Sequence, residues 1–344
     1  MRSVQVTAPG VASWVEVPEP SCGPRDVKLR MRAVGICGSD AMYTAVGGIP
    51  PRQGATPLGH EPAAEVVEIG AEVAETAGVR VGDHVVIDTM AFTDGLLGSG
   101  GAQGGLSEYV VVKDVVAGRQ LKVVPAEVPW EVAALNEPMA VALHGVNRSR
   151  LRPGEKVVIF GAGPIGLGAL LGFKSQGAGH VTVVDVQPGR LAKATAIGAD
   201  AVIDSTQEDV ITRLIELHGQ AGPSFVRGVR PDSDVYYDAA GVPAVIATAQ
   251  AAAKHGARLT IVAVHKKPVE FDLGALLSTE LTLALSMGYP TEIFEVTEDL
   301  VANWEKYAQI ISHRIPYHDA LDALTLAATP GAADKVTVIF PDQQ

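Results

Sequence analysis

The chain has 344 residues, of which 47% are hydrophobic and 19% charged, and its formal net charge is −12. This length allows two domains with large cores, and the composition excludes a chain that is disordered throughout. The acidic balance argues against a nucleic-acid partner, which would favour a basic surface, and suits a protein whose partners are small molecules.

The two cysteines, Cys22 and Cys37, are too few for a disulfide framework, so we expect a reducing, cytoplasmic location. The N-terminal residues lack the apolar run of a signal peptide. The longest uncharged apolar stretch, residues 157–173, is interrupted by five glycines and Pro164. It is too short and too broken to cross a bilayer, and we expect no membrane partner.

Residues 1 to about 145 contain short β-branched runs separated by glycine and proline. Such runs bounded by turn residues are typical of strands, and we predict strands at 27–34, 64–69, 84–87 and 109–112. The N-terminal part is therefore expected to form a β-rich, partly barrel-like domain.

From about residue 150 to residue 288, apolar strands alternate with helical stretches. Strands are predicted at 156–160, 181–185, 201–203, 234–237, 258–264 and 281–286, and helices at 164–176, 188–197, 208–217 and 243–255. This alternation is typical of parallel strands joined by right-handed crossovers. We therefore predict an α/β fold with a six-stranded, doubly wound (Rossmann) parallel sheet.

After residue 290 the sequence predicts an amphipathic helix and a last strand at 335–340. A terminal segment of this kind can return to the first domain. We therefore expect one domain from residues 1–148 and 289–344 and a second domain from residues 149–288.

The strongest local motif follows an apolar strand and reads Gly161-Ala-Gly163-Pro164-Ile165-Gly166. Between a strand and a helix, this pattern predicts a dinucleotide-binding turn. Gly161 permits the tight turn, Gly163 lets a pyrophosphate approach the backbone, and Gly166 lets the helix pack on the strand. The helix N-terminus offers free N–H groups to the phosphates. An ordinary turn without a ligand is the alternative.

Asp185 ends the second strand of this domain. An acidic side chain at that point hydrogen-bonds the adenosine ribose and repels a 2′-phosphate, which favours NAD over NADP. Arg190 lies on the next helix and can reach the adenine or a phosphate, so NADP stays open.

Cys37, His60, Glu61 and Glu137 lie in segments that contain glycine or proline. Sulfur, nitrogen and oxygen donors together suit zinc. These residues do not form a compact motif, however, and their spacing fits equally well a buried cysteine, a capping histidine and surface acids.

Several segments together resemble one family over nearly the whole chain. They are GICGSD at 35–40, GHEPAAEVVEIG at 59–70, GDHVV at 82–86, GGLSEYVVV at 104–112, NEPMAVALHGV at 136–146 and GAGPIG at 161–166. Their order and spacing resemble the zinc-dependent medium-chain alcohol dehydrogenases, in particular the branch with sorbitol, threonine and 2,3-butanediol dehydrogenases. The resemblance implies a GroES-like, β-rich catalytic domain and a homo-oligomer, either a dimer or a tetramer.

The resemblance also implies a zinc site. Cys37 and His60 correspond to zinc ligands of the family, and Glu61 and Glu137 to exchanging partners in the third position. An open fourth position would bind water or the substrate. Asp40 resembles the acid that orients the histidine ligand.

Relatives often carry four cysteines for a structural zinc, but the matching stretch, residues 88–104, contains no cysteine. We therefore expect one catalytic zinc per chain and no structural zinc. Of the other histidines, His84 is expected to be solvated, and His144 to pack at the domain junction rather than to bind metal.

The function implied by the resemblance is hydride transfer between a secondary alcohol, polyol or vicinal diol and NAD, with zinc polarising the alcohol oxygen. Ser39 resembles the hydroxyl that starts the family's proton relay. Relatives often end this relay at a histidine where this chain has Met42. The relay would then run through the ribose to water or use Tyr43. A zinc-free quinone reductase and a non-catalytic NAD-binding protein are the alternative interpretations.

Overall fold

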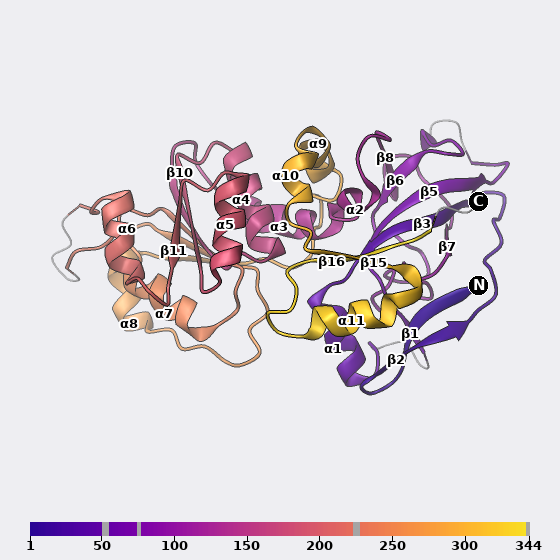
Figure 1. Ribbon diagram of the computed structural model, residues 1–344. Helices are drawn as coiled ribbons and strands as arrows, with labels where there is room; N and C mark the ends of the chain where they lie inside the picture. Colours follow the sequence, from indigo (N-terminus) through magenta and orange to yellow (C-terminus); the bar gives the residue numbers. More distant parts are fainter. Residues whose placement is uncertain (50–54, 74–76, 223–227, 342–344) are drawn as a thin grey trace. The chain divides into compact units, whose positions relative to one another are not determined.

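The computed structural model describes residues 1–49, 55–73, 77–222 and 228–341. The chain divides into two compact units, of which unit 1 comprises Met1–Glu137 and Ile293–Gln344, and unit 2 comprises Pro138–Glu292. In Figure 1 the first strands, in indigo, and the last helix, in yellow, both belong to unit 1. Among the described residues, no helix has the length and apolar character needed to span a membrane.

Unit 1 is built on two sheets. The smaller sheet, of order β2-β1-β4, contains β1 (Arg2–Ala8), β2 (Val11–Glu16) and β4 (Thr56–Pro57). The larger sheet, of order β15-β16-β3-β5-β6-β8 with β7 paired to β3, contains β3 (Val27–Gly35), β5 (Glu61–Ile69), β6 (His84–Ile87), β7 (Tyr109–Val112), β8 (Leu121–Val124), β15 (His313–Pro316) and β16 (Val336–Ile339). Its helices are α1 (Gly38–Val46), α2 (Trp130–Ala133), α9 (Glu295–Ala302), α10 (Trp304–Ala308) and α11 (Ala320–Ala328).

The alternation of residues along β3 explains how this sheet forms. Val27, Leu29 and Met31 are buried in the core of unit 1. Between them, Arg30 lies on the other face and reaches Glu65 of β5. β5 begins at Glu61, earlier than the predicted residue 64, because Glu61 pairs with Gly35 at the end of β3. The pairing therefore extends to the residues expected to bind metal.

Unit 2 confirms the predicted doubly wound fold, and its six parallel strands have the order β11-β10-β9-β12-β13-β14. The strands are β9 (Lys156–Phe160), β10 (His180–Asp185), β11 (Ala201–Asp204), β12 (Val235–Asp238), β13 (Arg258–Ile261) and β14 (Thr282–Leu285). The helices are α3 (Asn136–Arg148), α4 (Pro164–Ser175), α5 (Pro188–Ile197), α6 (Val210–His218), α7 (Pro243–Ala252) and α8 (Leu273–Leu276). The inner strands are apolar on both faces, as expected where helices cover both sides of a sheet.

The start of unit 2 depends on how α3 packs. A Cβ atom on Gly168 of α4 would lie 2.6 Å from the sulfur of Met139, and one on Gly145 of α3 would lie 2.5 Å from the hydroxyl of Tyr237. These close approaches bind α3 to the parallel sheet. The unit boundary therefore falls within the first turn of α3, between Glu137 and Pro138, whereas the sequence suggested limits at residues 148 and 289.

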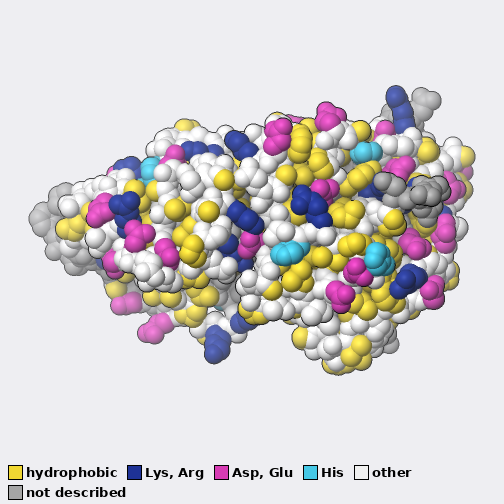
Figure 2. All heavy atoms as spheres, in the orientation of Figure 1, with side chains coloured by type: hydrophobic (Ala, Val, Ile, Leu, Met, Phe, Trp, Pro, Cys, Tyr) yellow, Lys and Arg dark blue, Asp and Glu magenta, His cyan; other side chains and the backbone are white. Residues whose placement is uncertain are grey.

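The surface carries both signs of charge. On the face drawn in Figure 2, acidic and basic side chains are interspersed among apolar ones. No single sign of charge dominates this face.

Candidate active site

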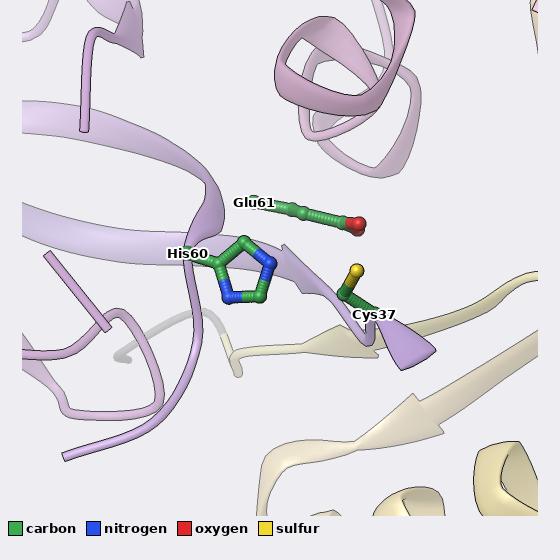
Figure 3. Close-up of side chains that lie close together, drawn as sticks. All are labelled: Cys37, His60 and Glu61. Carbon is green, nitrogen blue, oxygen red and sulfur yellow. The ribbon is translucent and has the colours of Figure 1, made fainter. Parts of the chain in front are cut away.

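Three side chains of metal-ligating type converge in unit 1. The sulfur of Cys37, a ring nitrogen of His60 and a carboxylate oxygen of Glu61 all lie within 4.8 Å of one another. Figure 3 shows the sulfur and the carboxylate close together beside the imidazole ring. Within the described ranges, no other three such residues come as close. A sulfur, a nitrogen and an oxygen donor fit the preferences of zinc.

Two side chains of α1 lie beside the histidine of this cluster. Asp40 is fully buried, accepts a hydrogen bond from the backbone N–H of Cys37 at 2.9 Å, and lies 3.4 Å from Nδ1 of His60. The hydroxyl of Ser39 lies 3.2 Å from Nε2 of His60. Burial alone would lower the pKa of His60, but the charges of Asp40 and Cys37 outweigh it and raise that pKa well above its usual range. The acid is thus a charged neighbour of Nδ1, and Nε2 faces Ser39.

Lys335 is a member of this site that the sequence did not reveal. Its ammonium group forms a buried ion pair with Glu61 and donates a hydrogen bond to the carbonyl of Ile36 at 3.2 Å. Burial lowers the pKa of Lys335, but the carboxylate of Glu61 outweighs burial, so the pKa is raised. The only sign of this role in the sequence was that a lysine directly precedes the apolar strand β16. Gly35 makes room, because a Cβ atom there would lie 2.0 Å from Oε2 of Glu61.

Glu137 lies near this cluster without joining it. It is not among the ligand atoms that meet within 4.8 Å. Burial raises the pKa of Glu137, and the charge of Glu61 adds to this effect, whereas His60 and Lys335 oppose it. α3 begins at Asn136, so Glu137 occupies the first helical turn and is not the capping residue. The cluster carboxylate in this structure is that of Glu61.

The glycine-rich turn of unit 2 has the form that a dinucleotide requires. Gly161 has a φ of +97°, and a Cβ atom on Gly166 would lie 1.8 Å from the carbonyl oxygen of Gly161. A Cβ atom on Gly163, in contrast, would meet nothing within 4 Å. Gly163 precedes α4, whose first residue is Pro164 and whose N-terminus has no side-chain cap. The space over Gly163 is therefore open to a phosphate, which a helix N-terminus attracts.

Asp185 ends β10 beside this turn and already has backbone partners. Its carboxylate accepts hydrogen bonds from the N–H groups of Ala162, Val186 and Gln187, at 2.7–2.9 Å. Each carboxylate oxygen can accept more than one bond, so ribose hydroxyls can still be bound. Ile165 and Arg190 lie in the first turns of α4 and α5. All the predicted cofactor residues thus lie near the carboxyl ends of the parallel strands β9 and β10.

Comparison with known proteins identifies the chain. The model of the alcohol dehydrogenase GroES-like domain matches residues 23–120, and that of the zinc-binding dehydrogenases matches residues 164–303. The (R,R)-butanediol dehydrogenase of Bacillus subtilis (strain 168) is 34% identical over 79% of this chain and 80% of its own length. The chain belongs to the zinc-dependent medium-chain alcohol dehydrogenase family.

Further relatives support this membership over the whole length. The sorbitol dehydrogenase of Bombyx mori is 28% identical over 94% of both chains. The structure of a candidate zinc-binding dehydrogenase from Sinorhizobium meliloti 1021, solved with NADP bound, superposes with a TM-score of 0.82 at 28% identity, covering 98% of both chains. Because these relatives are dehydrogenases of the same family, the chain is an enzyme.

Other residues considered for this dehydrogenase lie in different surroundings. His84 is partly exposed, and one face of its ring stacks on the indole of Trp130 with the centroids 3.7 Å apart. His144 donates a hydrogen bond from Nδ1 to Oε1 of Glu292 at 2.9 Å. Tyr43 lies close to the cluster, with its ring centroid 6.3 Å from that of His60.

The stretch that lacks the four cysteines is held by polar contacts. The side chain of Gln103 donates to the carbonyl of Val111 and accepts from its N–H group, both at 2.8 Å. Gln103 also donates to Asp94, whose carboxylate pairs with Lys113 at 3.1 Å. These bonds tie residues 88–104 to β7.

Proposed function

We propose that this dehydrogenase transfers a hydride between a secondary alcohol, polyol or vicinal diol and NAD at a zinc ion held by Cys37, His60 and Glu61. The convergence of these three donors within 4.8 Å carries the proposal. Bound zinc would polarise the alcohol oxygen, and the nicotinamide would accept the hydride. The butanediol and sorbitol dehydrogenases among its relatives support a diol or polyol substrate. This donor set favours the zinc enzyme over a zinc-free quinone reductase or a non-catalytic protein.

The chain's own residues would orient the site and move the proton. Asp40 would hold the His60 ring in place, and its carboxylate favours the tautomer with the proton on Nδ1. The hydroxyl of Ser39 lies beside Nε2 of His60 and would take the alcohol proton. Since Met42 cannot relay it, Tyr43, whose ring centroid lies 6.3 Å from that of His60, would carry the proton onward.

The choice of NAD rests on Asp185. A carboxylate at the end of β10 would bind the ribose hydroxyls and repel a 2′-phosphate. The Sinorhizobium structure was solved with NADP, which makes the preference of this chain worth measuring directly. We also propose a single zinc per chain, with Glu61 rather than Glu137 as the resting third ligand.

We further propose a homo-oligomer, a dimer or tetramer, that uses the edge strand β14. This strand is the last in the order of the parallel sheet, so one row of its backbone groups is unpaired within the described part of unit 2. Leu285 is 65% exposed and Met287 86% exposed beside it. An apolar edge strand is a template for pairing, and a second copy would cover it. A reducing, cytoplasmic location rests on the two free thiols of Cys22 and Cys37.

Metal analysis and a substrate panel test this function. We expect about one zinc per chain and NADH formation with some members of a panel of diols, sugar alcohols and amino alcohols. Cys37→Ala should remove the zinc and the turnover while the protein still binds NADH. Cys22→Ala is the matched control, because the Cys22 thiol only donates to the carbonyl of Asp26, at 3.3 Å, and to other backbone carbonyls. Zinc retained by Cys37→Ala, or turnover by a zinc-free protein, would contradict the proposal.

The two glutamates can be separated by the same measurements. Glu→Gln keeps the size and an oxygen donor but removes the charge. Glu61→Gln should weaken zinc binding by about 10–100-fold or more, since even changes beyond the ligands cost that much. Glu137→Gln should keep the zinc. Loss of zinc from Glu137→Gln alone would make Glu137 the third ligand.

A further inference from the structure

A buried carboxylate and a histidine form a pair near the carboxyl ends of the parallel strands of unit 2, where the glycine-rich turn also lies. Asp238 ends β12 and is fully buried, and its Oδ2 lies 2.7 Å from Nε2 of His265. The other oxygen of Asp238 accepts hydrogen bonds from the N–H groups of Ala240 and Gly241, both at 2.9 Å. The carboxylate therefore fixes both the loop after β12 and the imidazole.

Backbone contacts place this pair next to the glycine-rich turn. Asp238 is in register with Phe160, the last residue of β9. A Cβ atom on Gly161 would lie 3.1 Å from the carbonyl carbon of Ala239. β13 ends at Ile261, earlier than the predicted residue 264, because the next two N–H groups both donate to the carbonyl of Asp238. The chain then turns and brings His265 back to the edge.

The strand order decides which half of a dinucleotide would meet His265. In doubly wound sheets the dinucleotide crosses the edge where the strand order reverses, here between β9 and β12. Asp185, on the β10 side, marks the adenosine half. The nicotinamide half must then extend over the carboxyl ends of β12 and β13, where Asp238 ends β12 and His265 lies in the loop after β13.

The second nitrogen of the imidazole lacks a partner. Nδ1 of His265 is buried and has no hydrogen-bond partner among the described residues, although 13% of the side chain is exposed. A buried polar atom left unpaired is costly, and each such atom needs an explanation. A ligand group that reaches this edge would supply the missing partner.

We propose that His265 binds the nicotinamide half of the dinucleotide through Nδ1, with Asp238 holding the ring in position. The partner would be a polar group beyond the pyrophosphate, either the carboxamide or a hydroxyl of the nicotinamide ribose. This inference rests on the proposed NAD-linked function and adds a specific cofactor contact to it.

Two substitutions separate a contact through Nδ1 from a purely structural role. His265→Gln places its amide nitrogen as many bonds from Cβ as Nε2, so it keeps a partner for Asp238 and removes the group at Nδ1. His265→Asn does the opposite, because its amide nitrogen corresponds to Nδ1. His255→Gln is the matched control, since His255 also lies near an acid, Glu280, but precedes the opposite end of β13.

The experiment measures the dissociation constants of NADH, ADP-ribose and ADP for each folded variant. We expect His265→Gln to bind NADH about tenfold more weakly, as expected for one lost hydrogen bond to a buried group, and to bind ADP like the wild type. His265→Asn should bind NADH more tightly than His265→Gln, and His255→Gln should resemble the wild type. ADP-ribose identifies the cofactor group that His265 contacts. If His265→Gln binds ADP-ribose more weakly than the wild type does, the contact is with the ribose. If it binds ADP-ribose equally well, the contact is with the carboxamide.

Other outcomes overturn the proposal. Equal weakening of NADH and ADP, or tighter NADH binding by His265→Gln than by His265→Asn, would show that His265 only supports the loop. Unchanged NADH binding by His265→Gln would exclude the contact while leaving the NAD-linked function intact. A wild-type protein that binds no NADH would overturn the proposed function and this inference together.

Discussion

Lys335 and Glu61 form a buried ion pair, although 274 residues separate them along the chain. Their side chains are only 4% and 1% exposed. Glu61 also belongs to the cluster with Cys37 and His60, so its carboxylate has two possible cationic partners, the lysine and a metal ion. Removing one partner of a buried pair typically costs about 3–5 kcal/mol, because the other charge stays buried.

Lys335→Met should therefore lower the melting temperature of the zinc-free protein markedly, while zinc should raise that temperature more in the variant than in the wild type. The reason is that zinc would then be the only cation near Glu61. Calorimetry with and without zinc measures both effects. Combining Lys335→Met with Glu61→Gln removes both charges and should restore part of the stability. An equal response to zinc in the variant and the wild type would show that the two cations act independently.

Gly35→Ala should displace the Glu61 carboxylate, since a Cβ atom would lie 2.0 Å from its Oε2 and 3.1 Å from Cε of Lys335. We expect a loss of about 1–3 kcal/mol in the free energy of unfolding, as for other overpacked sites, together with reduced zinc content. Gly38→Ala is the control in the same segment, because its Cβ would meet nothing within 4 Å. Equal stability of the two variants would mean that Glu61 moves aside freely.

Asp185→Ser should reduce the preference for NAD over NADP by about tenfold or more, because it removes a charge that binds ribose and repels phosphate. The ratio of kcat/KM values for the two cofactors measures this preference. Asp204→Ser provides the control, since Asp204 ends the neighbouring strand β11 in register with Asp185. An unchanged ratio in Asp185→Ser, or wild-type enzyme that uses both cofactors equally, would contradict the ribose assignment.

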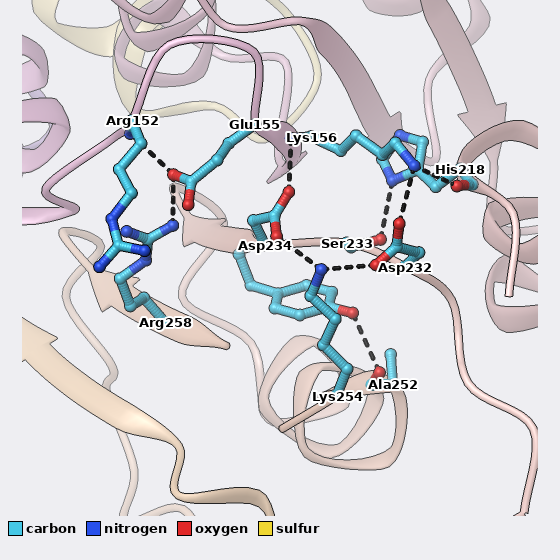
Figure 4. Close-up of polar contacts among 11 residues, drawn as sticks. Arg152, Glu155, Lys156, His218, Asp232, Ser233, Asp234, Ala252, Lys254 and Arg258 are labelled. Carbon is cyan, nitrogen blue, oxygen red and sulfur yellow. Dashed lines mark hydrogen bonds and ion pairs between the residues drawn. The ribbon is translucent and has the colours of Figure 1, made fainter. Parts of the chain in front are cut away.

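A buried histidine, His218, lies near the amino end of β10 and predicts that the stability of the protein falls in acid. His218 bonds to Ser233 through Nδ1 at 2.7 Å, and through Nε2 to Thr182 at 2.9 Å and His180 at 3.1 Å. Figure 4 shows His218 in the network that also contains Lys156, Asp232, Asp234 and Lys254. Burial, followed by the charges of His180 and Lys156, lowers the pKa of His218 from 6.5 to about 4, while Asp234 and Asp232 oppose this shift.

Between these two pKa values the unfolded chain binds more protons at His218 than the native protein does. The free energy of unfolding should therefore be highest above pH 6.5 and fall as the pH drops toward about 4, by up to about 3 kcal/mol from this residue. Urea titrations across this range measure the loss. His218→Asn has no titrating group and should show a shallower dependence on pH. If the free energy of unfolding of His218→Asn fell with pH as steeply as that of the wild type, the acid sensitivity would come from other residues.

The sequence alone determined the local features of this protein. The alternation of apolar strands and helices predicted the six-stranded sheet, because periodicity reports which face of each element is buried. The glycines at 161, 163 and 166 could be interpreted because each has a steric role within one short turn. Cys37 and His60 were recognised through motifs, and the fold brings them together with Glu61.

Only the tertiary structure decided which distant groups meet. Lys335 pairs with Glu61 because β16 adds to the sheet beside β3, and Glu137 stays outside the three-residue cluster although its motif suggested a ligand. Asp238 reaches His265 because two parallel strands end side by side, and His84 stacks on Trp130. Each of these contacts joins residues that no local pattern relates. Burial then decides which charges and polar atoms need a partner, and burial is a property of the folded chain.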